Sequence, residues 1–111
     1  MWQNLEVSEF SVLEKLVAEY TIGTVGVLSS PTMKVRVYEN VRGTFIGVTE
    51  VQIKMKFDGL FKGGIGHGAT EEETLSNTLK YFYEMIEENY PDRDETGLKE
   101  NEMRFNESCE F

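Results

Sequence analysis

His67 and Cys109 are the only histidine and cysteine in the chain, and they are therefore the first candidates for catalysis. A thiol acts as a nucleophile when a positioned base removes its proton, and these two residues lie far apart in the sequence. One cysteine and one histidine cannot form an internal disulfide or a cysteine–histidine zinc cluster. The acidic residues fall in charge runs typical of solvated helix faces. The sequence therefore indicates a protein that is not an enzyme and that needs no metal or cofactor.

Four residues have side chains suited to binding a ligand: His67, Asn77, Arg93 and Arg36. His67 stands between two glycines, either as an exposed loop residue or as a flat ring presented to a ligand. Asn77 is expected to point away from the core, where it is either solvated or in contact with a neighbouring subunit or a ligand. Arg93 and Arg36 are either surface charges or partners for phosphate, because a planar guanidinium matches phosphate geometry.

The charge distribution limits the classes of partner that the protein can bind. The net charge is −9, which argues against a general nucleic-acid binder because such proteins need a basic footprint. It favours solubility or a partner that is itself basic. Residues 33–62 differ from the rest, with six bases against three acids. Within that segment, Arg36, Lys54 and Lys56 are predicted to share the solvated face of a sheet, where they can form an anion-binding patch.

The stretch 63–82 organises the predicted fold, because a glycine-dense segment runs directly into a helix start. Thr70 and Glu73 have the spacing of a capping box, in which each side chain bonds the other residue's amide. Three glutamates, Glu71 to Glu73, occupy the first turn, where the helix dipole is positive. The glycines lack the lysine and hydroxyl residue of a phosphate-binding P-loop. We therefore predict a tight glycine loop between a strand and a helix.

The hydrophobic pattern predicts an α+β fold of order α-β-β-β-β-α, in which both helices pack on the apolar face of an antiparallel meander of three or four strands. A first helix is expected from about Ser8 to Tyr20, ended by Gly23. A second helix is expected from about Glu71 to Asn89. Strands are predicted at 24–28, 33–38, 44–57 and 60–62, with a two-residue hairpin at Asp58-Gly59. The expected core face of the second helix carries Leu75, Leu79, Phe82 and Ile86.

The length indicates one domain, which we place at residues 1–91. Residues 92–111 are charged and aperiodic, and form either a disordered tail or a segment that docks on a partner subunit through Met103, Phe105 and Phe111. No stretch is apolar enough to span a membrane, and no signal peptide precedes the domain. We therefore expect a cytoplasmic protein, in the host cytoplasm if a phage encodes it.

The predicted element order and the Gly66-x-Gly68-x-Thr70 start of the last helix resemble a double-stranded-RNA-binding domain. That family places lysines at the start of its last helix to bind phosphates. Glu71, Glu72 and Glu73 stand there in this chain. The resemblance therefore implies the fold without the RNA-binding function.

A narrower resemblance covers Gly66 to Phe82, which is 17 of the 111 residues. This segment is similar to bacteriophage anti-Thoeris "sponge" proteins, which bind signalling isomers of cyclic ADP-ribose between subunits. In that family an aromatic residue between the glycines, a helix asparagine and a later arginine contact the ligand. His67, Asn77 and Arg93 stand at comparable places, although His67 replaces the expected phenylalanine.

The resemblance and the residues together predict a non-enzymatic anti-defence protein of a bacteriophage, which sequesters a small anionic nucleotide and forms a homo-oligomer. His67 is expected to stack on a ring, Asn77 to hydrogen-bond, and Arg93 to pair with phosphate with help from Arg36. The alternative is an acidic inhibitor, such as an anti-CRISPR or DNA mimic, that covers a basic surface of a host protein. A third interpretation is a structural oligomer without a ligand.

Overall fold

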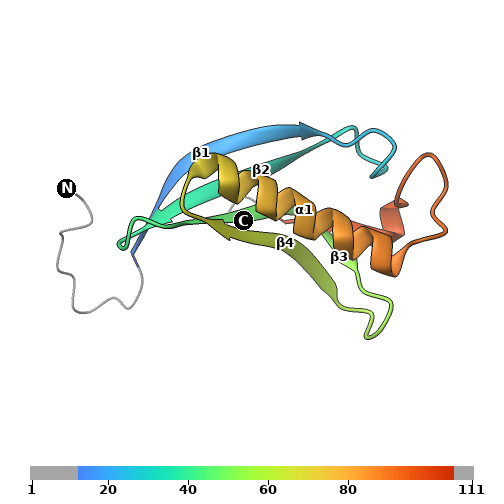
Figure 1. Ribbon diagram of the computed structural model, residues 1–111. Helices are drawn as coiled ribbons and strands as arrows, with labels where there is room; N and C mark the ends of the chain where they lie inside the picture. The colour runs from blue at the N-terminus through green and yellow to red at the C-terminus, as the bar shows by residue number, and fades with distance from the viewer. Residues whose placement is uncertain (1–12, 107–111) are drawn as a thin grey trace.

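The computed structural model describes residues 13–106 as a curved antiparallel sheet crossed by one long helix (Figure 1). In chain order the elements are β1 (Glu14–Gly23), β2 (Thr32–Asn40), β3 (Phe45–Lys54), β4 (Phe61–Gly68), α1 (Glu71–Asn89), the short 3-10 helix η2 (Glu100–Glu102) and β5 (Met103–Phe105).

The sheet is a meander of order β1-β2-β3-β4, and all of its strand pairs are antiparallel. The C-terminal strand β5 adds to β3 and pairs Met103 with Ile53. Helix α1 lies over β4 and β3 on one face of the sheet. The predicted α+β class and antiparallel meander are confirmed. The predicted number of helices on the sheet is not confirmed, because within residues 13–106 α1 is the only helix longer than a single turn.

The predicted N-terminal helix over 8–20 is wrong where the structure describes it, because Glu14–Gly23 is strand β1. Its first part, Ser8 to Val12, lies outside the described residues. A β-bulge between Leu16 and Ala18 explains the error. Leu16 pairs with Tyr38 on one face, whereas Ala18 and Tyr20 point to the other. The bulge breaks the period of two, so the apolar spacing mimics a helix.

Three local predictions also need correction. Residues 24–28 form a hydrogen-bonded turn and not a strand, with the Leu28 amide donating to the Thr24 carbonyl at 2.9 Å. Asp58 and Gly59 do lie in a turn, and Gly59 has φ +73, but the connection between β3 and β4 spans residues 55–60. The predicted glycine loop at 63–68 is part of strand β4, and His67 is therefore a strand residue.

The predicted second helix is confirmed over Glu71–Asn89, and Thr70 is its N-cap. The Glu73 amide donates to the Thr70 hydroxyl at 3.1 Å. The Glu73 carboxylate accepts from the Ala69 amide at 3.4 Å, so the return bond of the capping box falls one residue earlier than expected. This cap fixes the helix start directly after β4, and the orientation of α1 over the sheet follows from it.

The main core lies under the C-terminal half of α1. Phe82, Met85 and Ile86 of the helix pack there on the buried side chains of β2 and β3. The C-terminal segment closes this core, because Leu98 is fully buried and Met103 is 7% exposed. The described part of the predicted tail, residues 92–106, therefore packs on its own chain, and β5 pairs with β3 of that same chain.

The N-terminal half of α1 lies close to the sheet because the contacting strand residues have no side chains. This glycine–threonine seam consists of Gly47, Gly66, Gly68, Thr74 and Thr78, and Gly64 continues it under Phe82. A Cβ atom on Gly66 would stand 2.7 Å from the Thr78 Cα, and one on Gly68 would stand 2.8 Å from the Thr74 amide nitrogen. Both distances are below van der Waals contact. The glycines therefore permit a close approach, as expected, and the element that approaches is the chain's own helix.

The buried residues in the N-terminal half of α1 are the threonines of the seam. Thr74 and Thr78 are fully buried, whereas Leu75 and Leu79 are only partly buried beside the core. Each threonine hydroxyl donates to the carbonyl four residues earlier, Thr74 to Thr70 and Thr78 to Thr74, both at 2.7 Å. The buried hydroxyls are therefore satisfied within the helix. The helix faces the sheet about one residue away from the predicted register, although Phe82 and Ile86 are core residues as predicted.

Candidate functional site

His67 and Asn77 are in contact through the backbone of His67 and the side chain of Asn77. The Asn77 amide donates to the His67 carbonyl at 2.8 Å, so it links α1 to the edge strand β4. Both side chains are exposed. Because Gly66 and Gly68 face the helix, the His67 ring points to the opposite, helix-free face of the sheet. The two side chains therefore do not face a common ligand within one subunit.

Arg36 lies on β2 and faces away from α1. Its Nε donates to the Glu19 carboxylate at 2.7 Å, and Lys34 Nζ lies 3.8 Å from the same carboxylate. The hydrogen bond from Arg36 lowers the pKa of Glu19 below its ordinary value, so this pair stays charged near neutral pH. Arg36 shares the helix-free face with His67, and not with Asn77.

Arg93 follows the C-terminal end of α1, about 18 Å along the helix axis from Asn77. Its guanidinium donates to Glu87 at 2.6 Å, to the Tyr83 hydroxyl at 3.1 Å and to the Tyr90 carbonyl at 3.0 Å. It also lies 5.5 Å from the centre of the Tyr83 ring. The side chain is only 15% exposed. Arg93 therefore holds the chain after the helix in place, and it remains charged because Glu87 raises its pKa further.

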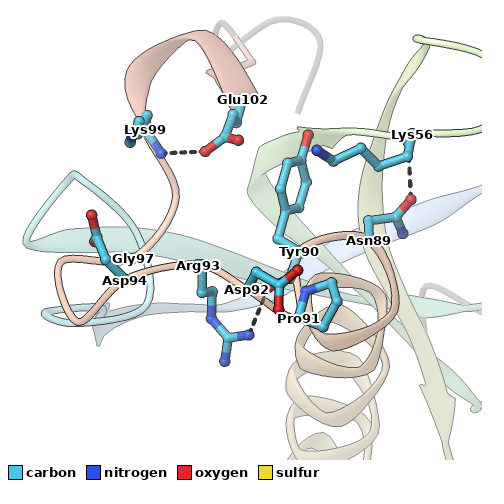
Figure 2. Close-up of a pocket in the computed structure, with 10 residues that line it drawn as sticks. All are labelled: Lys56, Asn89, Tyr90, Pro91, Asp92, Arg93, Asp94, Gly97, Lys99 and Glu102. Atoms are coloured by element: carbon cyan, nitrogen blue, oxygen red, sulfur yellow. Dashed lines mark hydrogen bonds between the residues drawn. The ribbon is translucent and has the colours of Figure 1, made fainter.

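A pocket of 270 Å³ lies beside this arginine, and we call it the helix-end pocket (Figure 2). One wall is the end of α1 with the turn that follows it, and the other wall comes from the segment 97–102. Figure 2 shows Lys56 extending over Tyr90. The lining residues are Lys56, Asn89, Tyr90, Pro91, Asp92, Arg93, Asp94, Gly97, Lys99 and Glu102.

Hydrogen bonds fix the walls of the helix-end pocket. Asn89 accepts from the Lys56 amide at 3.0 Å and donates to the Met85 carbonyl at 2.8 Å, which ties the helix end to the strand connection. The Tyr90 hydroxyl donates to the Lys54 carbonyl at 2.5 Å. Burial raises the pKa of Tyr90, so the phenol stays neutral at physiological pH. Hydrogen bonds therefore hold the helix end and the strand connection of the pocket together.

Three cationic residues, Lys56, Arg93 and Lys99, line this pocket. Lys56 Nζ lies 4.6 Å from the centre of the Tyr90 ring, and Lys99 stands on the opposite wall. Two of the acids in the lining are already committed within the chain. Asp94 accepts from the Thr96 amide and hydroxyl, which lowers its pKa, and Glu102 accepts from the Lys99 amide at 2.8 Å. These hydrogen bonds leave both carboxylates charged, so together with Asp92 the lining carries three acids beside the three cations.

A second pocket of 260 Å³ adjoins the first and shares Lys56, Tyr90 and Glu102 with it. Lys54 lies in its lining, beside the hairpin turn. The predicted anion patch of Arg36, Lys54 and Lys56 is thus separated in space: the two lysines border these pockets, and Arg36 lies at mid-sheet. Sequence reasoning missed Tyr90 and Lys99. Tyr90 carried a signal, because it directly precedes the helix-ending proline, whereas nothing local marks Lys99.

Within residues 13–106, no group of three or more histidine, cysteine, aspartate or glutamate side chains is placed to hold a metal ion. The same described residues contain no helix that is both long and apolar enough to cross a membrane. The chain is thus defined at the level of its architecture, a four-stranded meander with one covering helix and a fifth, C-terminal strand. Beyond that level, no protein-family model, curated protein or solved structure matches it significantly.

Proposed function

We propose that the protein is a non-enzymatic binder of a small phosphate-bearing ligand, held in the helix-end pocket. The observation that carries the proposal is that Lys56, Lys99 and Arg93 all line one concave site, beside three acids, in a chain of net charge −9. An acidic protein repels anions over most of its surface, so a site for an anion needs local cations in a fixed frame.

Each residue has a distinct role in this proposal. Lys56 and Lys99 contact the phosphates from opposite walls. Arg93 contributes its fixed charge and positions the backbone of the 90–97 turn, because its hydrogen bonds are committed to Glu87, Tyr83 and Tyr90. A ligand with two phosphates and flat rings extends past Lys56 into the adjoining pocket, since each compartment alone is slightly smaller than the ~300 Å³ typical of ligand sites.

The ligand that we propose is a cyclic ADP-ribose isomer, and this choice comes from the resemblance of residues 66–82 to anti-Thoeris sponge proteins. The biological role is then sequestration of an immune signal in the cytoplasm of a host cell, for a bacteriophage. The helix-end pocket is a different place from the His67–Asn77 contact that the resemblance points to. Binding at the two places is therefore separable by experiment.

The test is a calorimetric titration of cyclic ADP-ribose isomers into the wild-type protein and into Lys56→Gln/Lys99→Gln. A charge-assisted hydrogen bond contributes about 1.5–3 kcal/mol, so the double variant should lose roughly 100-fold or more in affinity. Lys80→Gln is the matched control, because Lys80 is an exposed lysine on α1 outside the pocket. Equal affinity in all three proteins would contradict the assignment of the pocket.

A second candidate, an acidic inhibitor of a basic host surface, is favoured by the exposed carboxylates around the end of α1. They are Glu84, Glu87, Glu88, Asp92, Asp94 and Glu95. Such an array can face a basic protein or imitate DNA phosphates. This candidate predicts no heat with any small nucleotide, and loss of inhibition when Glu84 and Glu88 are changed to glutamine.

A further inference from the structure

The helix-free face of the sheet carries two complete cross-strand rows. The strand registers place Leu16, Tyr38, Ile46 and His67 side by side across β1, β2, β3 and β4. The next row along the strands consists of Glu19, Arg36, Val48 and Ile65. Five of these eight side chains are aliphatic or tyrosine, and they are contiguous.

This pattern differs from a sheet face that is simply solvated. In an antiparallel sheet with one solvated face, residues along each strand alternate between apolar side chains on the buried face and polar side chains on the solvated face. Here Leu16 is 46% exposed and Ile65 is 47% exposed, with Ile46 and Val48 between them. Helix α1 covers the opposite face, so it gives these residues no shelter.

Charge on the helix-free face is balanced, unlike charge on the rest of the protein. By strand register its acids are Glu14, Glu19 and Glu50, and its bases are Lys34, Arg36, Lys54 and Arg104. Glu19 already pairs with Arg36 and Lys34 inside one subunit. Two chains of net charge −9 repel each other across most orientations. A face-to-face approach through this sheet is the orientation that keeps the excess carboxylates of α1 apart.

We propose that the helix-free face binds the same face of a second copy, forming a two-fold symmetric dimer with two packed sheets. Aligned sheet packing of this kind interdigitates the side chains of the two inner faces. Four strands spaced about 4.8 Å apart and about 30 Å long give a face of roughly 570 Å². A pair of such faces buries about 1,100 Å², at the lower end for a specific interface, so the dimer should dissociate in the micromolar range.

Sedimentation velocity over a concentration series tests the proposal, independently of any ligand. The wild-type protein should pass from 12.8 kDa to twice that mass as its concentration rises from about 1 to 500 µM. Ile65→Glu places a charge in the centre of the interface and should weaken association at least tenfold. Ile46→Glu should act in the same way on the neighbouring row.

Phe57→Glu is the matched control, because Phe57 is 97% exposed in the turn after β3 and lies off the helix-free face. It should associate like the wild-type protein, and far-ultraviolet circular dichroism should show that all variants are folded. A wild-type protein that stays monomeric at the highest concentration would overturn the proposal. Association that Phe57→Glu weakens as much as Ile65→Glu would overturn it too, because the contact would then lie elsewhere.

Raising the salt concentration adds a second readout of the same dimer. Because both copies carry the same net charge, screening should strengthen association as ionic strength rises from about 0.05 to 0.5 M. An interface built from ion pairs between copies would weaken over this range. That second behaviour would overturn the balanced-charge argument.

Discussion

Replacing Gly66 with alanine tests the packing that positions α1 and, through it, the helix-end pocket. The new Cβ atom would stand 2.7 Å from the Thr78 Cα and closer still to the Thr78 amide nitrogen. These are backbone atoms in the middle of a helix, so no side-chain rotation relieves the clash. The helix or the edge strand must move by roughly an ångström to restore van der Waals contact.

Two opposing effects set the change in the free energy of unfolding for Gly66→Ala. Overpacking a close-packed interface destabilises a protein by about 1–3 kcal/mol. Replacing glycine by alanine restricts the unfolded chain and returns about 0.4–1 kcal/mol. The net loss in free energy of unfolding should therefore be about 1–2 kcal/mol. In a domain of this size that corresponds to a fall of about 5–15 °C in the thermal midpoint.

Thermal and urea denaturation, followed by circular dichroism, should compare Gly66→Ala with Gly63→Ala. Gly63 is in the same strand, but a Cβ atom there would lie 3.4 Å from the Thr49 hydroxyl and 3.5 Å from Gln52, which is ordinary contact. Gly63→Ala should therefore leave the midpoint within about 2 °C of the wild-type value. Equal midpoints for the two variants would refute the close approach of α1 to β4.

Three further predictions test the cap, the C-terminal segment and an ion pair. Thr70→Ala removes the acceptor for the Glu73 amide and should cost about 1 kcal/mol in urea unfolding; no change would mean that the helix start is misplaced. Leu98→Ala empties a fully buried site and should cost about 2–5 kcal/mol, whereas a loss below about 0.5 kcal/mol would show that the segment after α1 does not close the core. Acid titration tests the third prediction. The hydrogen bond from Arg93 lowers the pKa of Glu87 below 4.5 in the folded protein. The ion pair therefore stabilises the fold at pH values above the pKa that Glu87 has in the unfolded chain, and this stabilisation is lost as pH falls through the pKa of Glu87 in the folded protein. The thermal midpoint of the wild-type protein should therefore fall more steeply below pH 4.5 than that of Glu87→Gln, and parallel curves would contradict the pairing.

The sequence predicts the parts of the fold that depend on local signals. The alternation of Val51 and Ile53, the cap at Thr70 and the stop before Pro91 all identify their elements correctly, because each depends on neighbours within a few residues. Strand β1 was missed because the bulge at Leu16/Ala18 shifts the apolar spacing toward that of a helix. Strand β4 was predicted too short, at 60–62, because glycine normally signals a turn, and only the tertiary approach of α1 explains the glycines in the rest of the strand.

The candidate site was less predictable than the fold. Arg93 and Lys56 were singled out from their residue types, but their shared pocket depends on the return of the chain through Gly97 and Lys99. This return depends on contacts between residues that are far apart in the sequence. The Leu98 amide donates to the Val27 carbonyl at 3.0 Å, and no local pattern specifies that bond.

An amide-resolved NMR titration with a cyclic ADP-ribose isomer tests the central proposal most directly, because it reports both whether the ligand binds and where. We predict saturable shifts at Lys56, at Lys99 and along residues 89–97, with His67 and Asn77 little affected. Saturable shifts centred on His67 and Asn77 would place the ligand at the other end of α1 and contradict the helix-end pocket. An unchanged spectrum at millimolar ligand would contradict sequestration of this nucleotide altogether.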